Sequence, residues 1–255
     1  MLILIGLGLY DEKDLTFRGL ELAKRADELY IEFYTSKWHG KVENLEKLVG
    51  KKILKLERRD LEELAMKIVK KAKEKDVAIF VQGDPLVQTT HASLLLEAKK
   101  EKVRTRVVHN ASIVTAIAET GLHSQKFGRY VTIPFLDKTK GELPKSVYDV
   151  IEKNKKEGLH TLCLLDVVNE RYMTPNEGMK ILLLLEEVKK GQIFTEETKI
   201  IVLCRVGSPS SKIYFGKVKD LTKNDYGDPP AVIIVPGKLH FTEEQALKLS
   251  FPPYQ

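Results

Sequence analysis

From residue 2 to residue 108, short apolar runs alternate with amphipathic segments, and this alternation constrains the fold more than any other feature. The first run, Leu2-Ile3-Leu4-Ile5, is continuous and ends in glycine, which is typical of a strand buried inside a sheet. Repeated strand–helix alternation predicts right-handed crossovers and a mostly parallel sheet with helices on both faces. The predicted strands cover residues 2–6, 28–34, 52–56, 77–81 and 104–108.

Capping residues indicate where the helices between these strands begin. Thr16 is placed to cap a helix over residues 15–26. Asp60, with Glu63 three positions later, has capping-box spacing at the start of a helix over residues 60–74. Two further helices are predicted over residues 43–49 and 90–101.

The pattern changes after residue 110, so we predict an N-terminal α/β domain over 1–110 and a C-terminal α/β domain over 111–255. The second half lacks regular alternation and predicts a mixed sheet with helices. Thr174-Pro175-Asn176-Glu177 combines an N-cap, a first-turn proline and a capping-box glutamate before a helix to residue 190. Thr242 and Gln245 have the same spacing before a last helix. Further helices are predicted over 111–122 and 145–156, and strands over 128–134, 160–168, 199–206, 213–217 and 231–235.

Composition excludes several classes of protein. Hydrophobic residues make up 43% of the chain and charged residues 31%, which suffices for a large core and excludes general disorder. No apolar run approaches the roughly 20 residues of a membrane span, and residues 2–9 lack the basic leader of a signal peptide. We therefore expect a soluble, cytoplasmic protein. Cys163 and Cys204 lie in apolar runs and are expected to be buried, and no Cys/His cluster predicts a metal site.

The turn after the first strand resembles half of a dinucleotide fingerprint. Gly6 and Gly8 are present, but Asp11 occupies the position of the third glycine, and Asp14 adds a second carboxylate. An acidic turn repels a diphosphate, so NAD or ATP is disfavoured here. The glycines still allow a ligand to approach the backbone closely.

Two further turns follow predicted strands. Asp84 lies between Gly83 and Pro85 at the carboxyl end of a central strand, where open α/β sheets bind ligands. An Asx turn, in which Asp84 caps the backbone, explains the same residues equally well. Ser112 follows the fifth strand, where it either caps the next helix or marks a helix start that anchors a polar ligand group.

The opening segment from Ile5 to Thr16, the Gly83-Asp84-Pro85 corner and Ser112 together resemble the tetrapyrrole-methylase fold. Within that fold, further segments in the same order resemble the diphthine synthases over nearly the whole chain. These segments are Glu32-Phe33-Tyr34-Thr35-Ser36, Thr89-Thr90-His91, Thr120-Gly121-Leu122-His123, Gly158-Leu159-His160-Thr161, Gly227-Asp228-Pro229-Pro230 and Val235-Pro236-Gly237-Lys238-Leu239-His240.

The resemblance implies two α/β domains that bind S-adenosylmethionine in a cleft between them and release S-adenosylhomocysteine. It implies methylation of the amino group of a 3-amino-3-carboxypropyl histidine on translation elongation factor 2, a step towards diphthamide. It also implies a homodimer. From composition, rather than from the resemblance, we expect no membrane partner and no direct contact with nucleic acid. Carried over by motif, the cofactor contacts are Leu9, Asp84, Val87, Ser112, Ile113, Leu165, Val206 and Ala231. The family pattern has His at position 231 and Pro at position 111, whereas this chain has Ala at both.

The sequence leaves the catalytic residues open. We expect Asp84 to hold the cofactor and to offset its positive charge. Glu32 and His91 are candidate proton acceptors, although a satisfied polar residue near the cleft is the favoured interpretation of each. Arg205 and Lys238 are the candidates for contact with the substrate carboxylate.

Three alternatives stay open at this point. A methylase of the same fold could act on a corrin or sirohaem precursor. A nucleotide-dependent oxidoreductase would require the fingerprint that Asp11 interrupts. The net charge of +6 would suit an RNA-binding module without enzymatic activity.

Overall fold

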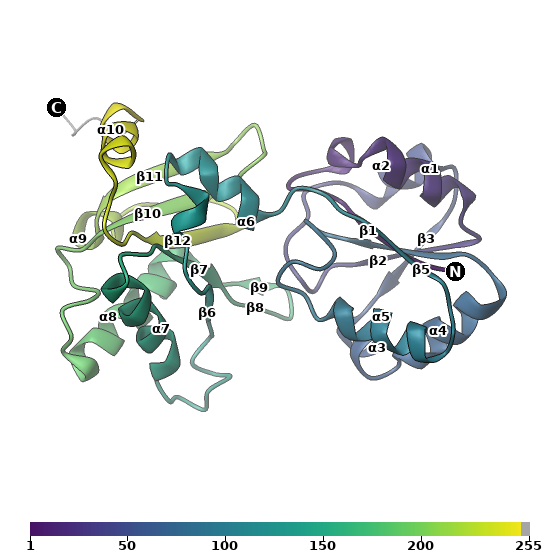
Figure 1. Cartoon of the computed structure of the whole chain (residues 1–255), viewed down its shortest axis with the longest axis horizontal. Helices are drawn as coiled ribbons and strands as arrows, with labels where there is room; N and C mark the ends of the chain where they lie inside the picture. Colours follow the sequence, from purple (N-terminus) through teal and green to yellow (C-terminus); the bar gives the residue numbers. More distant parts are fainter. Residues whose placement is uncertain (251–255) are drawn as a thin grey trace. The chain divides into compact units, whose positions relative to one another are not determined.

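The computed structural model describes residues 1–250, which divide into two compact units (Figure 1). The N-terminal unit comprises Met1–Ala116, and the C-terminal unit begins at Ile117. The boundary predicted at residue 110 lies shortly before this division, which follows Ala116. Both units are α/β, as predicted.

The N-terminal unit contains a five-stranded sheet in which every neighbouring pair is parallel. All five predicted strands are confirmed. The strand order is β3-β2-β4-β1-β5, with β1 (Leu2–Gly6), β2 (Glu28–Glu32), β3 (Ile53–Leu56), β4 (Val77–Val81) and β5 (Thr105–Val108). The predicted second strand is two residues too long, because the Glu32 carboxylate binds the backbone N–H groups of Tyr34 and Thr35 and ends the ladder.

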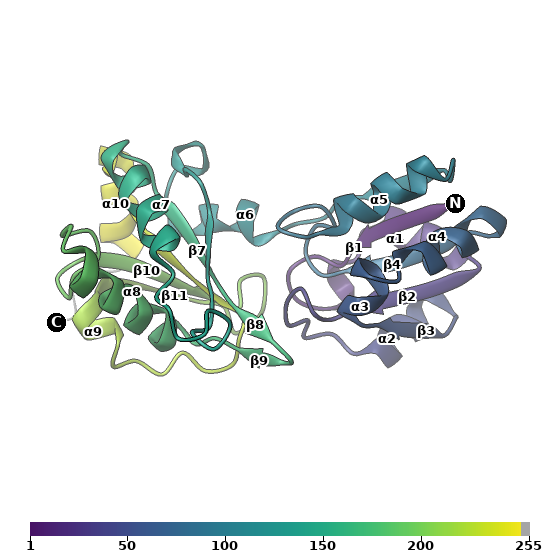
Figure 2. The same ribbon diagram turned by 90° about the horizontal axis from the view of Figure 1, so that it is seen from below.

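Helices cover both faces of this sheet, as the alternation predicts (Figures 1 and 2). Ile3 and Ile5 pack towards α1 (Phe17–Arg25) and α2 (Val42–Val49). Leu2 and Leu4 pack towards the opposite helices, which are α3 (Arg58–Glu62), α4 (Ala65–Glu74) and α5 (His91–Lys100). Burial on both sides explains why β1 is apolar throughout. Thr16 caps α1 by accepting a hydrogen bond from the Gly19 N–H, as predicted.

The single helix predicted over residues 60–74 is wrong. The chain forms α3 and α4 instead, with the break at Glu63 and Leu64. Glu57 is the N-cap of α3, and Asp60 closes the capping box three residues later. Asp60 therefore has the role that sequence analysis assigned to Glu63.

The C-terminal unit contains a mixed five-stranded sheet in the order β11-β10-β12-β7-β6. Its strands are β6 (Val131–Ile133), β7 (Thr161–Leu165), β10 (Lys199–Cys204), β11 (Lys212–Lys217) and β12 (Ala231–Val235). Only β6 and β7 pair in parallel. The strand predicted over 160–168 breaks at Asp166, whose side chain accepts the N–H groups of Phe135 and Val167. A short hairpin of β8 (Val167–Val168) and β9 (Arg171–Tyr172) follows.

Helices α7 (Lys145–Lys156) and α8 (Pro175–Lys189) cover one face of this sheet, and α10 (Phe241–Ser250) lies on the other (Figure 1). A short helix, α9 (Val218–Leu221), follows β11. The Thr174–Glu177 capping box is confirmed. Cys163 and Cys204 are buried, as predicted, and burial raises the pKa of the Cys204 thiol to about 11.

Two predicted helices differ from the structure. The helix predicted over 111–122 is a single turn, α6 (Ile113–Ala116), followed by 3-10 turns at Ile117–Thr120 and Ser124–Lys126. The last helix begins at Phe241 rather than after a Thr242 cap. The reason is that Glu243, not Gln245, accepts the N–H that precedes the helix, donated by His240 at 2.7 Å.

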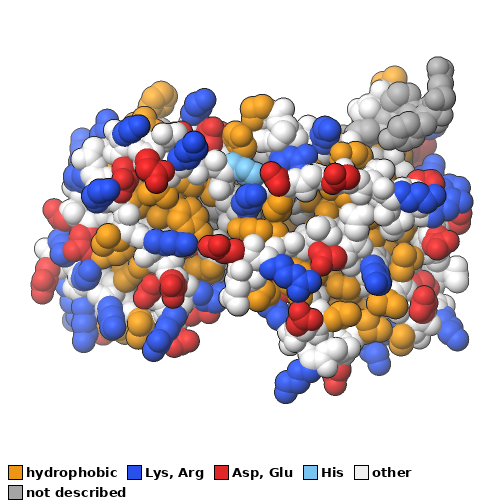
Figure 3. Space-filling model, turned by 180° about the vertical axis from the view of Figure 1, so that it is seen from behind, with side chains coloured by type: hydrophobic (Ala, Val, Ile, Leu, Met, Phe, Trp, Pro, Cys, Tyr) orange, Lys and Arg blue, Asp and Glu red, His pale blue; other side chains and the backbone are white. Residues whose placement is uncertain are grey.

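Within residues 1–250, no helix is both long and apolar enough to cross a membrane. Over the same residues, no three His, Cys, Asp or Glu side chains form a group that could hold a metal ion. On the face drawn in Figure 3, basic and acidic side chains are interspersed over both units, so this face shows no basic surface of the kind that RNA binding requires.

Candidate active site

The carboxyl ends of the five parallel strands meet at one edge of the N-terminal sheet, which we call the carboxyl edge. At this edge β1 and β4 are neighbours, and the helices that follow them, α1 and α5, cover opposite faces. This is the topological switch point at which open α/β sheets bind ligands. Backbone hydrogen bonds join the two turns here, from Gly8 N to Gly83 O at 3.3 Å and from Gly83 N to Gly8 O at 2.9 Å.

The close approach of these turns requires glycine. A Cβ atom on Gly6 would lie 2.6 Å from the Gly83 carbonyl oxygen and 2.7 Å from the Asn110 Cβ. Gly8 has φ +80°, and a Cβ atom there would lie 2.5 Å from the Asp14 Cβ. The glycines therefore bring the two turns together.

Asp14 occupies the hydrogen-bond donors of the first turn. Its Oδ2 accepts from the backbone N–H of Leu9 at 3.1 Å and of Tyr10 at 2.7 Å. In a dinucleotide site, backbone N–H groups of this turn bind the pyrophosphate. Because a carboxylate takes that place here, the oxidoreductase alternative loses its phosphate site.

Asp84 is buried at the switch point, with 6% of its surface exposed. Its Oδ1 accepts from the Leu86 N–H at 3.0 Å, which forms the Asx turn. Its Oδ2 accepts from the Asn110 N–H at 3.2 Å and lies 2.8 Å from His109 Nδ1. The structure thus confirms the Asx turn at Asp84 and places its carboxylate at the carboxyl edge, where a role in ligand binding stays a prediction.

Sequence analysis missed the contribution of His109 and Asn110. The Asn110 amide donates to the carbonyl oxygens of Gly6 and Asp14, each at 2.9 Å, and so connects β5 to the first turn. Both residues directly follow β5, as Asp84 follows β4. Their position after a parallel strand was the sequence feature that could have identified them as residues of the carboxyl edge.

The remaining predicted residues of this unit also lie in loops that leave the carboxyl edge. Val87 donates its N–H to the Asp84 carbonyl at 3.3 Å. Ser112 is 5% exposed, and its hydroxyl accepts the Val114 N–H at 3.2 Å, which confirms that it caps the turn that Ile113 begins. The structure therefore brings Leu9, Asp84, Val87, Ser112 and Ile113 to one edge of one sheet.

The predicted residues of the C-terminal unit lie together as well. Ala231 pairs with Cys204 across β12 and β10, and Val232 pairs with Leu164 across β12 and β7. This register places Leu165 beside Ala231. Val206 follows the same end of β10, where the Arg205 N–H donates to the Pro230 carbonyl at 2.8 Å. Leu165, Val206 and Ala231 thus form a group at one end of the sheet.

Neither candidate for the substrate carboxylate lies free beside that group. The Arg205 guanidinium donates to the carbonyl oxygens of Tyr226 at 2.6 Å and Asp228 at 2.5 Å, and Nε donates to Ser210 O at 3.2 Å. Arg205 therefore holds the loop before β12. Lys238 follows β12 at the opposite end from Ala231, and a five-residue strand separates the two by about 16 Å.

The candidate proton acceptors Glu32 and His91 lie inside the N-terminal unit, each 1% exposed. Tyr34 contacts both, because its N–H donates to Glu32 Oε2 at 3.0 Å and its hydroxyl lies 3.4 Å from His91 Nε2. Burial raises the pKa of Glu32 and lowers the pKa of His91. Glu32 Oε1 and His91 Nδ1 have no hydrogen-bond partner in the structure. Because both side chains are covered, neither is presented to a substrate.

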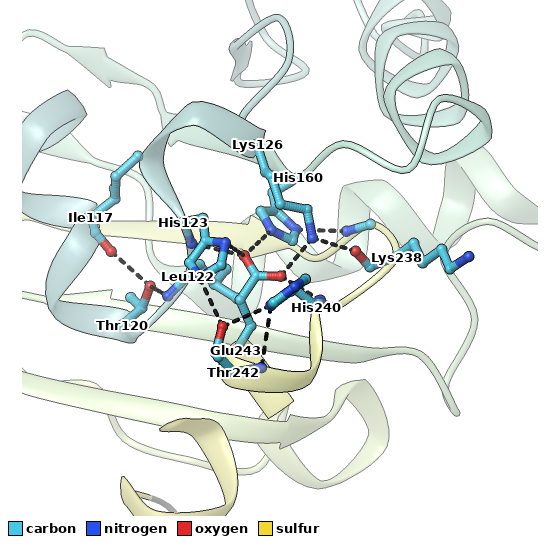
Figure 4. A network of polar contacts seen from close by, with 11 residues as sticks. Ile117, Thr120, Leu122, His123, Lys126, His160, Lys238, His240, Thr242 and Glu243 are labelled. Carbon is cyan, nitrogen blue, oxygen red and sulfur yellow. Dashed lines mark hydrogen bonds and ion pairs between the residues drawn. The ribbon is translucent and has the colours of Figure 1, made fainter. Parts of the chain in front are cut away.

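A second polar cluster surrounds Glu243 in the C-terminal unit (Figure 4). The buried carboxylate accepts from His123 N at 2.8 Å, Lys126 Nζ at 2.6 Å and His240 N at 2.7 Å, and lies 2.9 Å from His160 Nε2. Because Gly237 N–H donates to His160 Nδ1, this imidazole is neutral and donates from Nε2. The cluster joins α10 to β7 and to the segment before β6, and we assign it a structural role.

Comparison with known proteins agrees with this geometry. Residues 1–222 match the family model of the tetrapyrrole (corrin/porphyrin) methylases. The chain is 47% identical to the diphthine synthase of Methanocaldococcus jannaschii over 97% of its own length and 98% of the relative. It is 44% identical to the diphthine synthase of Methanococcus aeolicus, covering 97% of each chain. A crystal structure of diphthine synthase superposes with a TM-score of 0.89 at 36% identity, covering 97% of this chain and 94% of the other. The chain belongs to the tetrapyrrole methylase family.

Proposed function

We propose that this chain is an S-adenosylmethionine-dependent methyltransferase that methylates the amino group of the 3-amino-3-carboxypropyl histidine of translation elongation factor 2, giving diphthine. The observation that carries the proposal is the similarity to diphthine synthases, at 47% identity over 97% of this chain and 98% of the relative. We further propose that it acts in the cytoplasm as a homodimer.

The carboxyl edge suits a cofactor that is positively charged and has no phosphate. Asp14 occupies the N–H groups that would bind a phosphate, and Asp84 presents a carboxylate at the switch point. S-adenosylmethionine supplies an activated methyl group on a sulfonium and carries a second positive charge on its ammonium. The acidic residues of this edge therefore favour this cofactor over a nucleotide di- or triphosphate.

Each unit contributes one set of proposed cofactor contacts. Leu9, Asp84, Val87, Ser112 and Ile113 come from the carboxyl edge of the N-terminal sheet, with Asp84 as the charged member. Leu165, Val206 and Ala231 come from the C-terminal unit and offer apolar side chains and backbone groups. Since Ala231 lacks the imidazole of the family pattern, its contact is made by the backbone.

The chemistry asks mainly for alignment. The amine must be neutral and in line with the methyl group, and such positioning contributes about 7–11 kcal/mol. The pKa of an α-amino group is about 8, so loss of one proton at neutral pH costs little free energy by comparison.

Calorimetric titration with S-adenosylmethionine tests the cofactor site. We expect Asp84→Asn to weaken binding at least tenfold, because the variant loses the negative charge and keeps the shape. Asp27→Asn is the matched control, since Asp27 also accepts a backbone N–H, from Asp76, but lies at the amino end of β2. Equal affinity of the Asp84 variant and the wild type would remove Asp84 from the site.

The corrin or sirohaem alternative shares the fold and the cofactor. The similarity to diphthine synthases over the whole chain favours the protein substrate. If this protein methylated a tetrapyrrole precursor, as monitored by the absorption spectrum of the precursor, that result would support the alternative.

A further inference from the structure

His109 is the one histidine of the chain that is paired with a carboxylate at the carboxyl edge and is also exposed. Its Nδ1 lies 2.8 Å from Asp84 Oδ2, and 69% of the side chain is accessible, against 7% for Asp84. The chain has six histidines. His91 and His160 are buried, and His123 and His240 belong to the Glu243 cluster. The His39 ring lies against the Tyr10 ring in a tilted arrangement.

The pairing with Asp84 selects the tautomer of the neutral imidazole. A carboxylate accepts hydrogen bonds, so Nδ1 must carry the proton and donate. The other nitrogen, Nε2, is then unprotonated in the neutral ring and has its lone pair available. Within residues 1–250, no hydrogen bond occupies Nε2. An oriented imidazole with one free lone pair is the arrangement that a general base requires.

Asp84 is itself held rigidly. Its two oxygens accept the backbone N–H groups of Leu86 and Asn110, and the Asn110 side chain is bound to Gly6 and Asp14. The strand ends of β1, β4 and β5 thus position the carboxylate, and the carboxylate positions His109. Asp84 is also a proposed cofactor contact, so under the proposed function His109 belongs to the same site.

We propose that His109 is a catalytic base of this enzyme and that Asp84 is its positioning residue. For each methyl group transferred, the substrate ammonium gives one proton to His109 Nε2. The freed lone pair forms the N–C bond while the C–S bond breaks, and the bonding electrons stay on sulfur. Protonated His109 then releases the proton to water. This inference rests on the proposed function, because the amine is the substrate group that must lose the proton.

The test compares His109→Gln with the wild type in methyl transfer from labelled S-adenosylmethionine to elongation factor 2 that bears the aminocarboxypropyl histidine. At pH 7 we expect the variant to be about tenfold slower, with unchanged cofactor affinity, because only about a tenth of an amine that titrates at about pH 8 is neutral at pH 7. The ratio of wild-type to variant rate should fall towards one near pH 9.5, because the amine then arrives without its proton. A purely structural role of His109 would give a ratio that does not change with pH.

Two further variants sharpen the result. His240→Gln is the control, since His240 is also exposed but its Nδ1 contacts the Thr242 hydroxyl and no carboxylate. Added imidazole should accelerate His109→Ala and leave the wild type unchanged. Equal methyl-transfer rates of His109→Gln and the wild type at pH 7 would refute the role of His109 as a base. A rate of the variant that stays equally far below the wild type at pH 9.5 would refute it too. Neither result would contradict the proposed methyltransferase activity. A wild-type protein that binds the cofactor and transfers no methyl group would overturn the proposed function and this inference together.

Discussion

Glu243 is a fully buried charge whose removal should destabilise the C-terminal unit. Burial alone would raise its pKa, but hydrogen bonds from His240, Lys126, His123 and His160 lower the pKa from 4.5 to about 2. A difference of about 2.5 units corresponds to about 3 kcal/mol of stability at pH 7, at roughly 1.4 kcal/mol per unit. The exposed fraction of this side chain is 0%, so solvent does not screen the interaction.

The sign of the pH dependence follows from the lowered pKa. The carboxylate stabilises the folded state fully above the unfolded pKa of about 4.5, and this stabilisation is lost as the pH falls towards 2. Glu243→Gln should therefore cost about 3 kcal/mol at pH 7, and the gap should narrow to about 2 kcal/mol near pH 3.5. Urea unfolding of both proteins at the two pH values measures the gap.

Glu197→Gln is a matched control for the size of this effect. Contacts with Lys217 and Lys219 lower the pKa of Glu197 to about 2, as in Glu243, but 59% of the Glu197 side chain is exposed. Exposed pairs contribute little, so we expect no measurable change in its unfolding midpoint. An equal loss in the two variants, or a Glu243→Gln gap that does not depend on pH, would refute the role of burial in this argument.

Three further perturbations test the account. Gly6→Ala should destabilise the N-terminal unit by about 1–3 kcal/mol and weaken cofactor binding, because its Cβ would lie 2.6 Å from the Gly83 carbonyl oxygen. Thermal unfolding measures the loss of stability, and calorimetry measures cofactor binding. Gly50→Ala is the control for backbone strain, since a Cβ atom there would have no atom within 4 Å. Thr174→Ala should lower the free energy of unfolding by about 1 kcal/mol through loss of the α8 cap, whereas Thr174→Ser should keep most of the stability that the cap provides. A urea midpoint of Thr174→Ala equal to that of the wild type would contradict this. NADH should not bind in fluorescence titration, since Asp14 occupies the Leu9 and Tyr10 N–H groups, and saturable binding would show that this turn opens.

The parallel sheet could be predicted because its signal is local. A continuous apolar run such as Leu2-Ile3-Leu4-Ile5 indicates burial on both faces, and the helices between the strands leave few possible topologies. The caps at Thr16 and Thr174 were predicted for the same reason, because each depends on residues within one turn.

One error was local, and the others arose where side chains distant in the sequence, or burial in the folded unit, determine the outcome. Local spacing gave Asp60 the cap of α3, but Glu57 is the N-cap and the helix ends at Glu62. The start of α10 is set by Glu243, which also binds residues more than 80 positions away in the chain, such as His160. Glu32 and His91 have the right chemistry for proton transfer, and only their burial in the folded unit removes them.

In the candidate site, too, features with a local signal could be predicted, and features that depend on distant residues could not. The Asp84 corner could be found from its place after a strand, whereas the pairing of Asp84 with His109 spans 25 positions and depends on the adjacent order of β4, β1 and β5. Arg205 was a reasonable partner for a carboxylate until the structure showed its guanidinium bound to the carbonyl oxygens of Tyr226 and Asp228.

The most direct test of the central claim is the intact mass of elongation factor 2 bearing the aminocarboxypropyl histidine after incubation with this protein and S-adenosylmethionine. The account predicts mass gains in whole methyl units that require both protein and cofactor, and a slower gain with Asp84→Asn. A substrate mass that stays unchanged while calorimetry shows bound cofactor would contradict the claim that this histidine derivative is the methyl acceptor.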